Sequence, residues 1–204
     1  MRLATVGDAP AVLAVYAPYI RDTAITFETD VPSPAAFAAR MEGIIGTYPY
    51  LVIEEDGAVA GYAYAHRIGE RAAFAWNAEL SVYLAPSCQG RGWGEALLRT
   101  TLDLLALQGV RTAYSLVTVP NAASVGLHEK LGFTTMGIQT RAGFKGGAWH
   151  DVAWLHKSIG SFAGAPAPVT PLGALDPAAV DSAVAAGNAA LGAMAVPGTT
   201  VAPA

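Results

Sequence analysis

A glycine-rich segment near the middle of the chain is the clearest candidate for binding chemistry. It reads Gln89-Gly90-Arg91-Gly92-Trp93-Gly94-Glu95 and lies between a β-rich pattern and a helical one. A loop at the start of a helix directs free backbone N–H groups and the positive end of the helix dipole at a ligand. Glycines let that ligand approach the backbone, and Arg91 adds a positive charge. The segment therefore predicts an anion site suited to a pyrophosphate, with a plain tight turn as the alternative.

Other common reaction centres are not indicated. The glycine loop is not followed by Gly-Lys-Ser or Gly-Lys-Thr, and its third glycine comes one residue too early for the dinucleotide fingerprint. The histidines show no paired ligand spacing, and with a single cysteine, Cys88, we expect no zinc site. No Ser-His or Cys-His arrangement suggests a covalent nucleophile, so Cys88 is expected to pack beside the loop.

The first 159 residues alternate between strand and helix patterns, which predicts an α/β fold with a mixed sheet. Asp56-Gly57 predicts a tight hairpin, because both residues tolerate positive φ. Ser33-Pro34 predicts a helix start, with serine as the cap and proline in the first turn. We expect strands over 2–5, 50–55, 58–67, 75–84, 112–119, 133–141 and 148–156, and helices over 5–21, 34–45, 95–108 and 121–130.

Composition narrows the class of protein. The 204 residues include 12 basic and 16 acidic side chains, a net charge of −4, so no basic field would attract nucleic acid. Hydrophobic residues make up 53%, which is enough for a core although many of them are alanine. Neither a signal peptide nor an apolar run of about 18 residues is seen. We expect a cytoplasmic protein with no membrane or nucleic-acid partner.

Residues 160–204 form a tail rich in alanine, proline and glycine, with Asp176 and Asp181 as its only charged residues. The stretch 165–171 favours extended polyproline conformations and cannot build a core. Asp176-Pro177 could cap and start a helix that runs to about Ala190. We expect a disordered tail, with a docked amphipathic helix as the alternative, and place all chemistry in a domain over 1–159.

The motif Gln89-x-x-Gly92-x-Gly94 resembles the acyl-coenzyme A pyrophosphate motif of the GNAT acyltransferase superfamily. Over essentially all of residues 1–159 the chain resembles the phosphinothricin/methionine sulfoximine N-acetyltransferase branch of that superfamily. The blocks that carry this closer match are 23–28, 79–84, 121–133 and 145–152. The resemblance implies the GNAT fold, in which helices flank a mostly antiparallel sheet and the fourth and fifth strands splay apart.

The resemblance also implies acetyl-CoA as the cofactor and assigns residues to it. The pantetheine arm would lie between the splayed strands and pair with the backbone of Val82, Tyr83 and Leu84, as an added strand does. The pyrophosphate would bind the amides of Gly90, Arg91, Gly92, Trp93, Gly94 and Glu95. Asn121 would bind the arm through its side-chain amide, cap the helix that follows it, or do both.

Two residues are implied in catalysis. A free amino group is mostly ammonium at pH 7, so a base must remove a proton before it can attack the thioester. Glu79 resembles the family's proposed catalytic glutamate, with simple pairing to the substrate ammonium or an ordinary strand carboxylate as alternatives. His128 stands seven residues after Asn121, where many family members have tyrosine, and would protonate the departing thiolate. The alternative for His128 is a packed structural histidine.

The acceptor in this branch is a small amino acid analogue with an anionic side group, which calls for positive charge in the site. Arg71 matches the position of the family's substrate arginine, although Ala72 replaces the proline that many relatives carry there. Phe27 and Trp149 could form pocket walls and Lys145 could add charge. The alternative for these three residues is an ordinary place in the core or on the surface.

The resemblance thus implies an N-acetyltransferase that moves the acetyl group of acetyl-CoA to a small amino-acid-like amine by direct attack, in a detoxifying or resistance role. No metal is required. Another amine acceptor, such as a polyamine, a protein N-terminus or an aminoglycoside, is one alternative. A non-catalytic acyl-CoA-binding module is another. Relatives often dimerise, so a homodimer is expected.

Overall fold

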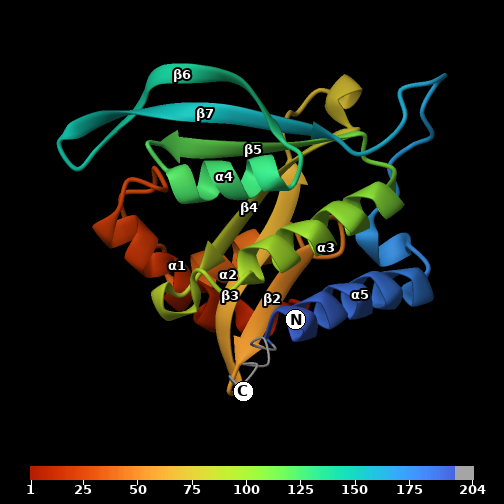
Figure 1. Cartoon of the computed structure of the whole chain (residues 1–204), viewed down its shortest axis with the longest axis horizontal. Coiled ribbons are helices and arrows are strands. Elements are labelled where there is room, and N and C mark those ends of the chain that lie inside the picture. The colour runs from red at the N-terminus through yellow and green to blue at the C-terminus, as the bar shows by residue number, and fades with distance from the viewer. Residues whose placement is uncertain (196–204) are drawn as a thin grey trace, which may run out of the picture.

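A seven-stranded mixed sheet forms the centre of the molecule (Figure 1). The computed structural model describes residues 1–195. The strand order is β1-β2-β3-β4-β5-β7-β6, and every neighbouring pair is antiparallel except β4 and β5, which are parallel. The strands are β1 (Arg2–Leu3), β2 (Tyr50–Glu55), β3 (Ala58–Arg67), β4 (Asn77–Leu84), β5 (Thr112–Val119), β6 (Thr134–Lys145) and β7 (Ala148–Ser158). The predicted α/β class with a mostly antiparallel sheet is confirmed.

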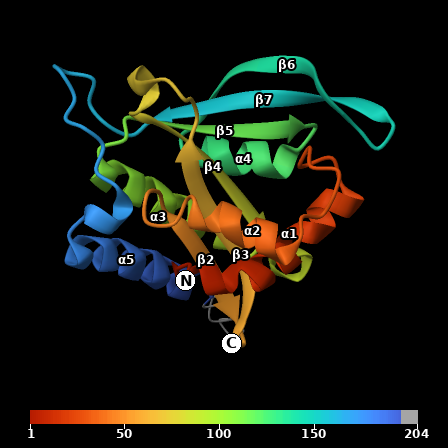
Figure 2. The ribbon, with the colours of Figure 1, turned by 180° about the vertical axis from the view of Figure 1, so that it is seen from behind.

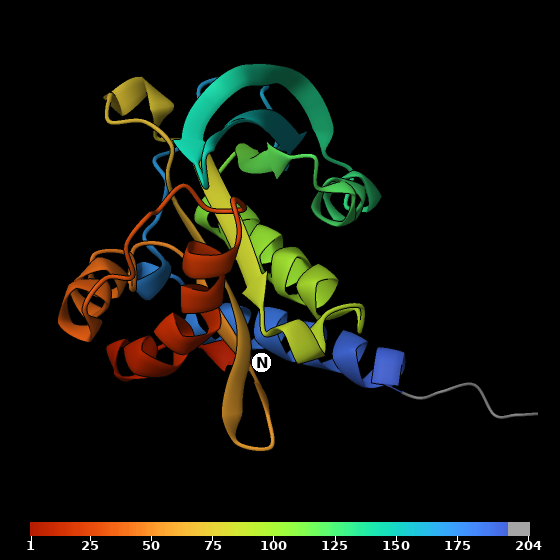
Figure 3. The same cartoon turned by 90° about the vertical axis from the view of Figure 1, so that its left-hand side faces the viewer.

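Helices cover both faces of the part of the sheet that contains β2, β3 and β4 (Figure 3). The helices are α1 (Ala9–Asp22), α2 (Pro34–Glu42), α3 (Trp93–Gln108), α4 (Ala122–Lys130) and α5 (Pro177–Ala195). Helices α1 and α2 pack on one face, where Phe37 and Tyr62 share a buried core. Helices α3 and α5 pack on the other face, where Leu97 and Val180 are buried together with Leu51. The sheet is therefore enclosed where its strands are most apolar.

Local sequence signals set many of these boundaries. Asp56 and Gly57 adopt φ angles of 50° and 80°, and the β2–β3 turn forms as predicted. Ser33 caps α2, because its Oγ accepts the N–H of Ala36 at 3.2 Å. Helix α2 ends at Glu42 and not near residue 45 as expected, since a glycine, a poor helix former, follows directly.

The last two strands extend further than predicted. Strand β6 continues past Arg141, its expected end, through a bulge in its pairing with β7. At this bulge Arg141 has a φ of 53° and its N–H donates to Oδ1 of Asp151 at 2.7 Å. Because a bulge allows pairing to resume on its far side, the two strands form one long hairpin that turns at Gly146–Gly147.

The tail carries a helix that packs on the domain, which corrects the expectation of disorder and matches the alternative. Oδ1 of Asp176 accepts the N–H of Ala178 at 3.1 Å, so α5 starts where Asp176-Pro177 predicted a helix. Helix α5 lies beside α3, as Figures 1 and 2 show from opposite sides. Burial of Leu172 and Val180 against the domain stabilises this segment despite its composition. Residues 196–204 of the predicted tail lie outside the described residues.

Helix α5 also holds the first residue of the chain. The amino group of Met1 donates to Oδ1 of Asn188 at 2.8 Å, and Nδ2 of Asn188 donates to the carbonyl oxygen of Met1 at 2.9 Å. The contact between α5 and α3 requires a glycine at position 187. A Cβ added to Gly187 would collide with Oγ1 of Thr100 in α3 and with Cε of Met1.

We expect Gly187→Ala to lower the midpoint of thermal unfolding and Gly192→Ala to raise it. Each change replaces a glycine inside α5 by alanine, and alanine is more favourable than glycine in a helix by up to about 1 kcal/mol. Nothing lies within 4 Å of a Cβ at Gly192, so the added helix stability is retained at that position. At Gly187 the added Cβ overpacks its neighbours, which costs about 1–3 kcal/mol. Scanning calorimetry of both variants measures the difference. Equal shifts in the two midpoints would mean that α5 does not pack on α3 in this way.

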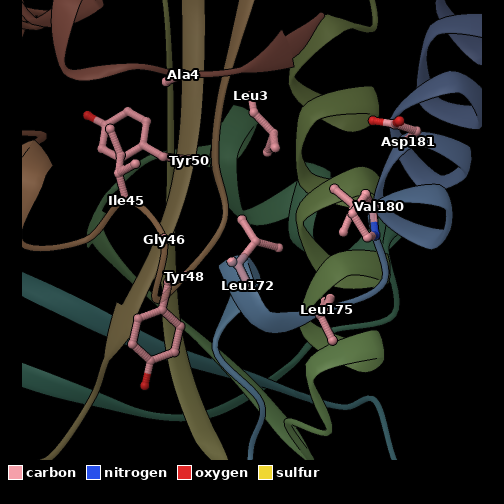
Figure 4. Close-up of a pocket in the computed structure, with 12 residues that line it drawn as sticks. Leu3, Ala4, Ile45, Gly46, Tyr48, Tyr50, Leu172, Leu175, Val180 and Asp181 are labelled. Atoms are coloured by element: carbon pink, nitrogen blue, oxygen red, sulfur yellow. The ribbon is translucent and has the colours of Figure 1, made fainter.

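A cavity of about 310 Å³ lies where the tail meets the β1 edge of the sheet (Figure 4). Leu3 and Tyr50 line it from the domain, and Leu172, Leu175 and Val180 line it from the tail. It adjoins the edge strand β1, whereas β4 and β5 meet in the middle of the sheet. This apolar cavity is therefore separate from the cleft that β4 and β5 form.

Candidate active site

Strands β4 and β5 separate after a short paired stretch and open a cleft. Residues 77–79 of β4 pair with residues 112–114 of β5, and beyond them the strands run on to Leu84 and Val119 without pairing with each other. A cavity of about 500 Å³ occupies this opening. Most residues predicted to bind the cofactor line it, namely Val82, Tyr83, Leu84, Gly90, Gly92, Gly94, Glu95 and Asn121. The expected splay between the fourth and fifth strands is present.

The start of α3 forms one end of the cleft. Gly92 precedes the helix with a φ of 79°, and Gly90 has a φ of 73°, a region that favours glycine. The amides of the first helical turn have no partners within the helix and face outward from its N-terminus. A Cβ on Gly94 would lie 3.3 Å from Leu127 and 3.6 Å from Leu84, so the glycine keeps this end of the cleft open. The arrangement suits an anion held by backbone amides.

Two residues of the loop turn away from the cleft. The guanidinium of Arg91 lies 4.1 Å from the centre of the Trp93 ring, and its Nη1 donates to Oε1 of Glu55 at 2.6 Å. Neither Arg91 nor Trp93 lines the cavity. Cys88 is buried beside the same glutamate, as the sequence suggested, and donates to its Oε2 at 3.4 Å. The Arg91 side chain is therefore engaged with Glu55, and only its backbone is left for a pyrophosphate.

The carboxylate at the mouth of the cleft is paired with two cations. The carboxylate of Glu95 accepts hydrogen bonds from Lys130 at 2.5 Å and from Arg99 at 2.9 Å. These two cations hold the pKa of Glu95 below its ordinary value. Lys130 and Glu95 both line the cleft, so an anion bound there would meet a paired carboxylate and not a free one.

Tyr19 lines the cleft although the sequence analysis did not single it out. Its hydroxyl donates to the carbonyl oxygen of Leu84 at 2.5 Å and accepts a hydrogen bond from Nε2 of Gln89 at 2.9 Å. Its ring packs against that of Tyr83 at 5.1 Å. Tyr19 therefore joins α1, the end of β4 and the glycine loop. An aromatic residue on an apolar helix face is typical of a core, and this pattern concealed its place in the site.

Glu79 lies at the apex of the splay. It is the last residue of β4 that pairs with β5, where it faces Tyr114, and it also faces His66 of β3. Its Oε1 is 3.9 Å from Nε2 of His66. Burial raises the pKa of Glu79 above its ordinary value, and the nearby His66 offsets part of this increase. Glu79 does not line the cavity of about 500 Å³ but lies where the two strands part, and its raised pKa makes it a better proton acceptor than an ordinary carboxylate.

His128 is held in a way that argues against the predicted role of proton donor. Its Nδ1 lies 2.7 Å from the carbonyl oxygen of Ser124, which only accepts hydrogen bonds, so Nδ1 carries the hydrogen. The neutral ring then has only a lone pair on Nε2, which is buried with no hydrogen-bond partner among residues 1–195. Burial lowers the pKa of His128, and the residue does not line the cleft. The packed histidine weighed as the alternative fits this geometry better.

Asn121 combines the two roles expected for it. It precedes α4, and its Oδ1 accepts the N–H of Ser124 at 3.1 Å, which is an N-cap. It also lines the cleft. The cap uses the oxygen of the side chain, so the NH₂ group of the same amide is left as a donor for a ligand.

The four predicted acceptor residues do not form one cluster. Phe27 and Lys145 lie together where the segment after α1 meets the β6–β7 hairpin: Nζ of Lys145 donates to the carbonyl oxygen of Thr26 at 2.7 Å, and the Phe27 ring fills the space over Gly143. A cavity of about 480 Å³ opens beside Lys145, and burial lowers the pKa of that residue.

The other two acceptor candidates lie apart from this contact. Arg71 is exposed in the connection between β3 and β4, directly before the short helical turn Ala72–Phe74. Trp149 is 61% exposed on the hairpin and packs against Phe144 at 5.5 Å. The structure therefore brings Phe27 and Lys145 together, whereas Arg71 lies in the β3–β4 connection and Trp149 is paired with Phe144 on the hairpin.

Residues 1–195 show two further features that bear on the class of site. No helix in that range is long and apolar enough to span a membrane. No three or more His, Cys, Asp or Glu side chains in the same range are grouped so that they could hold a metal ion.

Comparison with known proteins identifies the family. The model of the acetyltransferase (GNAT) domain matches residues 1–154. The chain belongs to the GNAT family. It is similar to a phosphinothricin N-acetyltransferase of Streptomyces viridochromogenes, 35% identical over 172 residues that cover 84% of this chain and 93% of that protein. An L-methionine sulfoximine/L-methionine sulfone acetyltransferase of Salmonella typhimurium is 33% identical over 164 residues, or 78% of this chain and 94% of that protein.

A solved structure supports the same family. The phosphinothricin acetyltransferase of Sinorhizobium meliloti, determined in complex with acetyl-CoA, matches with a TM-score of 0.80 and 33% identity. The match covers 85% of this chain and 96% of the other. The predictions of a GNAT fold, of an acetyltransferase and of acetyl-CoA as its cofactor are confirmed. The individual site residues stay predictions.

We expect the ring of His128 in this GNAT protein to stay neutral at pH 7, with its hydrogen on Nδ1. Burial lowers the pKa of His128 below its ordinary value of 6.5, so the neutral form persists to lower pH. Nitrogen-15 NMR of the histidine side chains reports both the charge and the tautomer. A charged ring at pH 7, or a hydrogen on Nε2, would contradict this assignment and restore His128 as a proton donor.

Proposed function

We propose that this chain transfers the acetyl group of acetyl-CoA to the amino group of a small amino-acid-like substrate of the phosphinothricin or methionine sulfoximine type. The observation that carries the proposal is the position of Glu79, a half-buried carboxylate at the point where β4 and β5 part to form the cleft that ends at the start of α3. The curated relatives named for these two substrates support the choice of acceptor.

Several parts of the chain would hold the cofactor. The amides of residues 90–95 would bind the diphosphate, and the free backbone edge of Val82, Tyr83 and Leu84 would pair with the pantetheine arm. The NH₂ group of Asn121 would donate to the same arm. The thioester that acetyl-CoA supplies is already activated, so these residues need only bind and orient it.

Glu79 would act on the acceptor. The amine binds as its ammonium ion, Glu79 removes one proton, and the neutral amine attacks the thioester carbonyl directly. No step is assigned to Cys88, which is buried against Glu55. The departing thiolate would take its proton from water in the cleft, because His128 has none on Nε2 in its neutral form.

The positive charge that an amino-acid-like acceptor requires would come from Lys145 and Arg71. Lys145 lines a cavity of about 480 Å³, and the exposed side chain of Arg71 has the freedom to move toward a bound anion. Trp149 would reach the site only by moving, since it is exposed. Acetylation removes the ammonium charge of a toxic amino acid analogue, which would give the enzyme a resistance role in the cytoplasm.

We also propose a homodimer. Met136 and Ile138 on the edge strand β6 are 58% and 50% exposed, and Phe144 and Trp149 further along the hairpin are 59% and 61% exposed. An edge strand with exposed apolar side chains is suited to pairing with another chain. Analytical ultracentrifugation would show a species of twice the chain mass, and a monomer at micromolar concentration would contradict the proposal.

A thiol-release assay tests the proposed acceptor. Purified protein with acetyl-CoA would be given phosphinothricin, methionine sulfoximine, spermidine, an aminoglycoside and a peptide with a free N-terminus. We expect the highest kcat/KM for one of the two amino acid analogues. A higher kcat/KM for any other amine would show that the proposed acceptor is wrong. Tight binding of acetyl-CoA with no turnover of any amine would indicate a non-catalytic binding module.

A further inference from the structure

His66 stands directly opposite the candidate base. It lies on β3 in antiparallel register with Glu79 of β4, and its Nε2 is 3.9 Å from Oε1 of Glu79. The His66 side chain is 35% exposed, whereas that of Glu79 is 20% exposed. The pair therefore leads from the point where β4 and β5 part towards solvent.

The hydrogen bond at Nδ1 of His66 determines whether Nε2 carries a hydrogen. Nδ1 lies 3.0 Å from the carbonyl oxygen of Arg67, and because a carbonyl only accepts, Nδ1 carries the hydrogen. In the neutral ring, Nε2 then presents a lone pair to Glu79. Tyr64 stacks on the ring at 5.7 Å and holds its plane. His66 is thus oriented to receive a proton from the carboxyl group of Glu79.

We propose that His66 is a positioning residue that takes up the proton which Glu79 removes from the acceptor. The inference rests on the proposed function of Glu79. The proton leaves the ammonium nitrogen for a carboxylate oxygen of Glu79, passes to Nε2 of His66, and leaves the exposed ring for water. A rotation of either side chain, or one bridging water, closes the gap of 3.9 Å. Only N–H and O–H bonds change, and Glu79 returns to its ionised form for the next turnover.

Electrostatics of the surroundings favour this pairing. Within residues 1–195, Tyr64 on β3 and Tyr114 on β5 also lie beside Glu79, and His156 of β7 lies beyond Tyr114. Arg40 and Glu28, which form an ion pair, act on Tyr64. Within residues 1–195, His66 is the one cationic group whose charge acts on Glu79. Once His66 has taken up the proton, its positive charge opposes the effect of burial and favours the ionised form of Glu79.

The test compares His66→Gln with His156→Gln. Both histidines stack on a strand tyrosine, but His156 does not face a carboxylate. For His66→Gln we expect kcat/KM for the amine to fall about tenfold at the acid end of the pH profile. The acid limb moves to higher pH, because Glu79 loses the charge that lowers its pKa. The profile of His156→Gln and the KM for acetyl-CoA should match those of the unaltered protein.

Further variants separate this proposal from the role of Glu79 itself. In a Glu79→Gln background, His66→Gln should have no additional effect, and imidazole added to His66→Ala should restore activity. If the acid limb of the pH profile is unchanged in His66→Gln while Glu79→Gln is inactive, the proton transfer to His66 is overturned. The proposed function of Glu79 then still stands. Full activity of Glu79→Gln would overturn the proposed base instead. Thermal unfolding of each variant shows whether it is folded. If His66→Gln is not folded, the rescue of His66→Ala by imidazole tests the proton transfer instead.

Discussion

Glu79→Gln is expected to lower kcat by about 10²–10⁴-fold while leaving the affinity for acetyl-CoA unchanged. Glutamine keeps the size of the side chain and can form hydrogen bonds, but it cannot take a proton from the ammonium ion. Glu79 lies where β4 and β5 part and does not line the cleft, whereas the backbone segments proposed to hold the cofactor do. Steady-state rates at saturating amine, together with calorimetric titration of acetyl-CoA, measure the two quantities separately.

Glu42→Gln is the matched control for this variant. Glu42 ends α2 and is exposed, with no ion pair or side-chain hydrogen bond among the described residues. The same carboxylate-to-amide change should leave both rate and affinity unaltered there. If Glu79→Gln weakened cofactor binding as much as turnover, Glu79 would be a structural residue of the β4–β5 junction and not a base.

Gly94→Val is expected to weaken acetyl-CoA binding by about 10- to 100-fold, which corresponds to an overpacking cost of about 1–3 kcal/mol. Gly94 lies in the first turn of α3, and a Cβ there already approaches Leu127 and Leu84 across the cleft. The two γ-methyl groups of valine would occupy the space between α3, β4 and α4. Isothermal titration calorimetry with acetyl-CoA measures the loss directly.

The control for this variant is Gly192→Val. Gly192 lies in α5 with nothing within 4 Å of an added Cβ, so the same substitution should leave the affinity for acetyl-CoA unchanged. Circular dichroism of both variants would confirm that the fold is kept. Equal affinities for Gly94→Val and the unaltered protein would show that the cofactor does not enter between Leu84 and Leu127.

Features with a local cause could be predicted from the sequence. The β2–β3 hairpin follows from Asp56-Gly57, and the α4 cap follows from Asn121, because each depends on a few adjacent residues. The glycine loop belongs to the same class, since Gly90 and Gly92 adopt the positive φ angles that their positions require. These signals correctly placed the end of the cleft at the start of α3.

Features that depend on distant residues could not be predicted. Arg91 turns to Glu55, and Tyr19 reaches Leu84, through contacts that join segments far apart in the chain. His66 faces Glu79 only because the register of β3 and β4 places them opposite each other. The tail shows a further limit: its composition resembles that of a disordered segment, but its few large apolar residues fall where they can pack on α3 and β2.

A crystal structure of the protein with acetyl-CoA is the most direct test of the account. We expect the diphosphate at the amides of residues 90–95, the pantetheine arm along Val82–Leu84 between β4 and β5, and the thioester carbonyl next to Glu79. A cofactor bound elsewhere, or an empty cleft at saturating acetyl-CoA, would contradict the central claim that the separation of β4 and β5 builds the binding site.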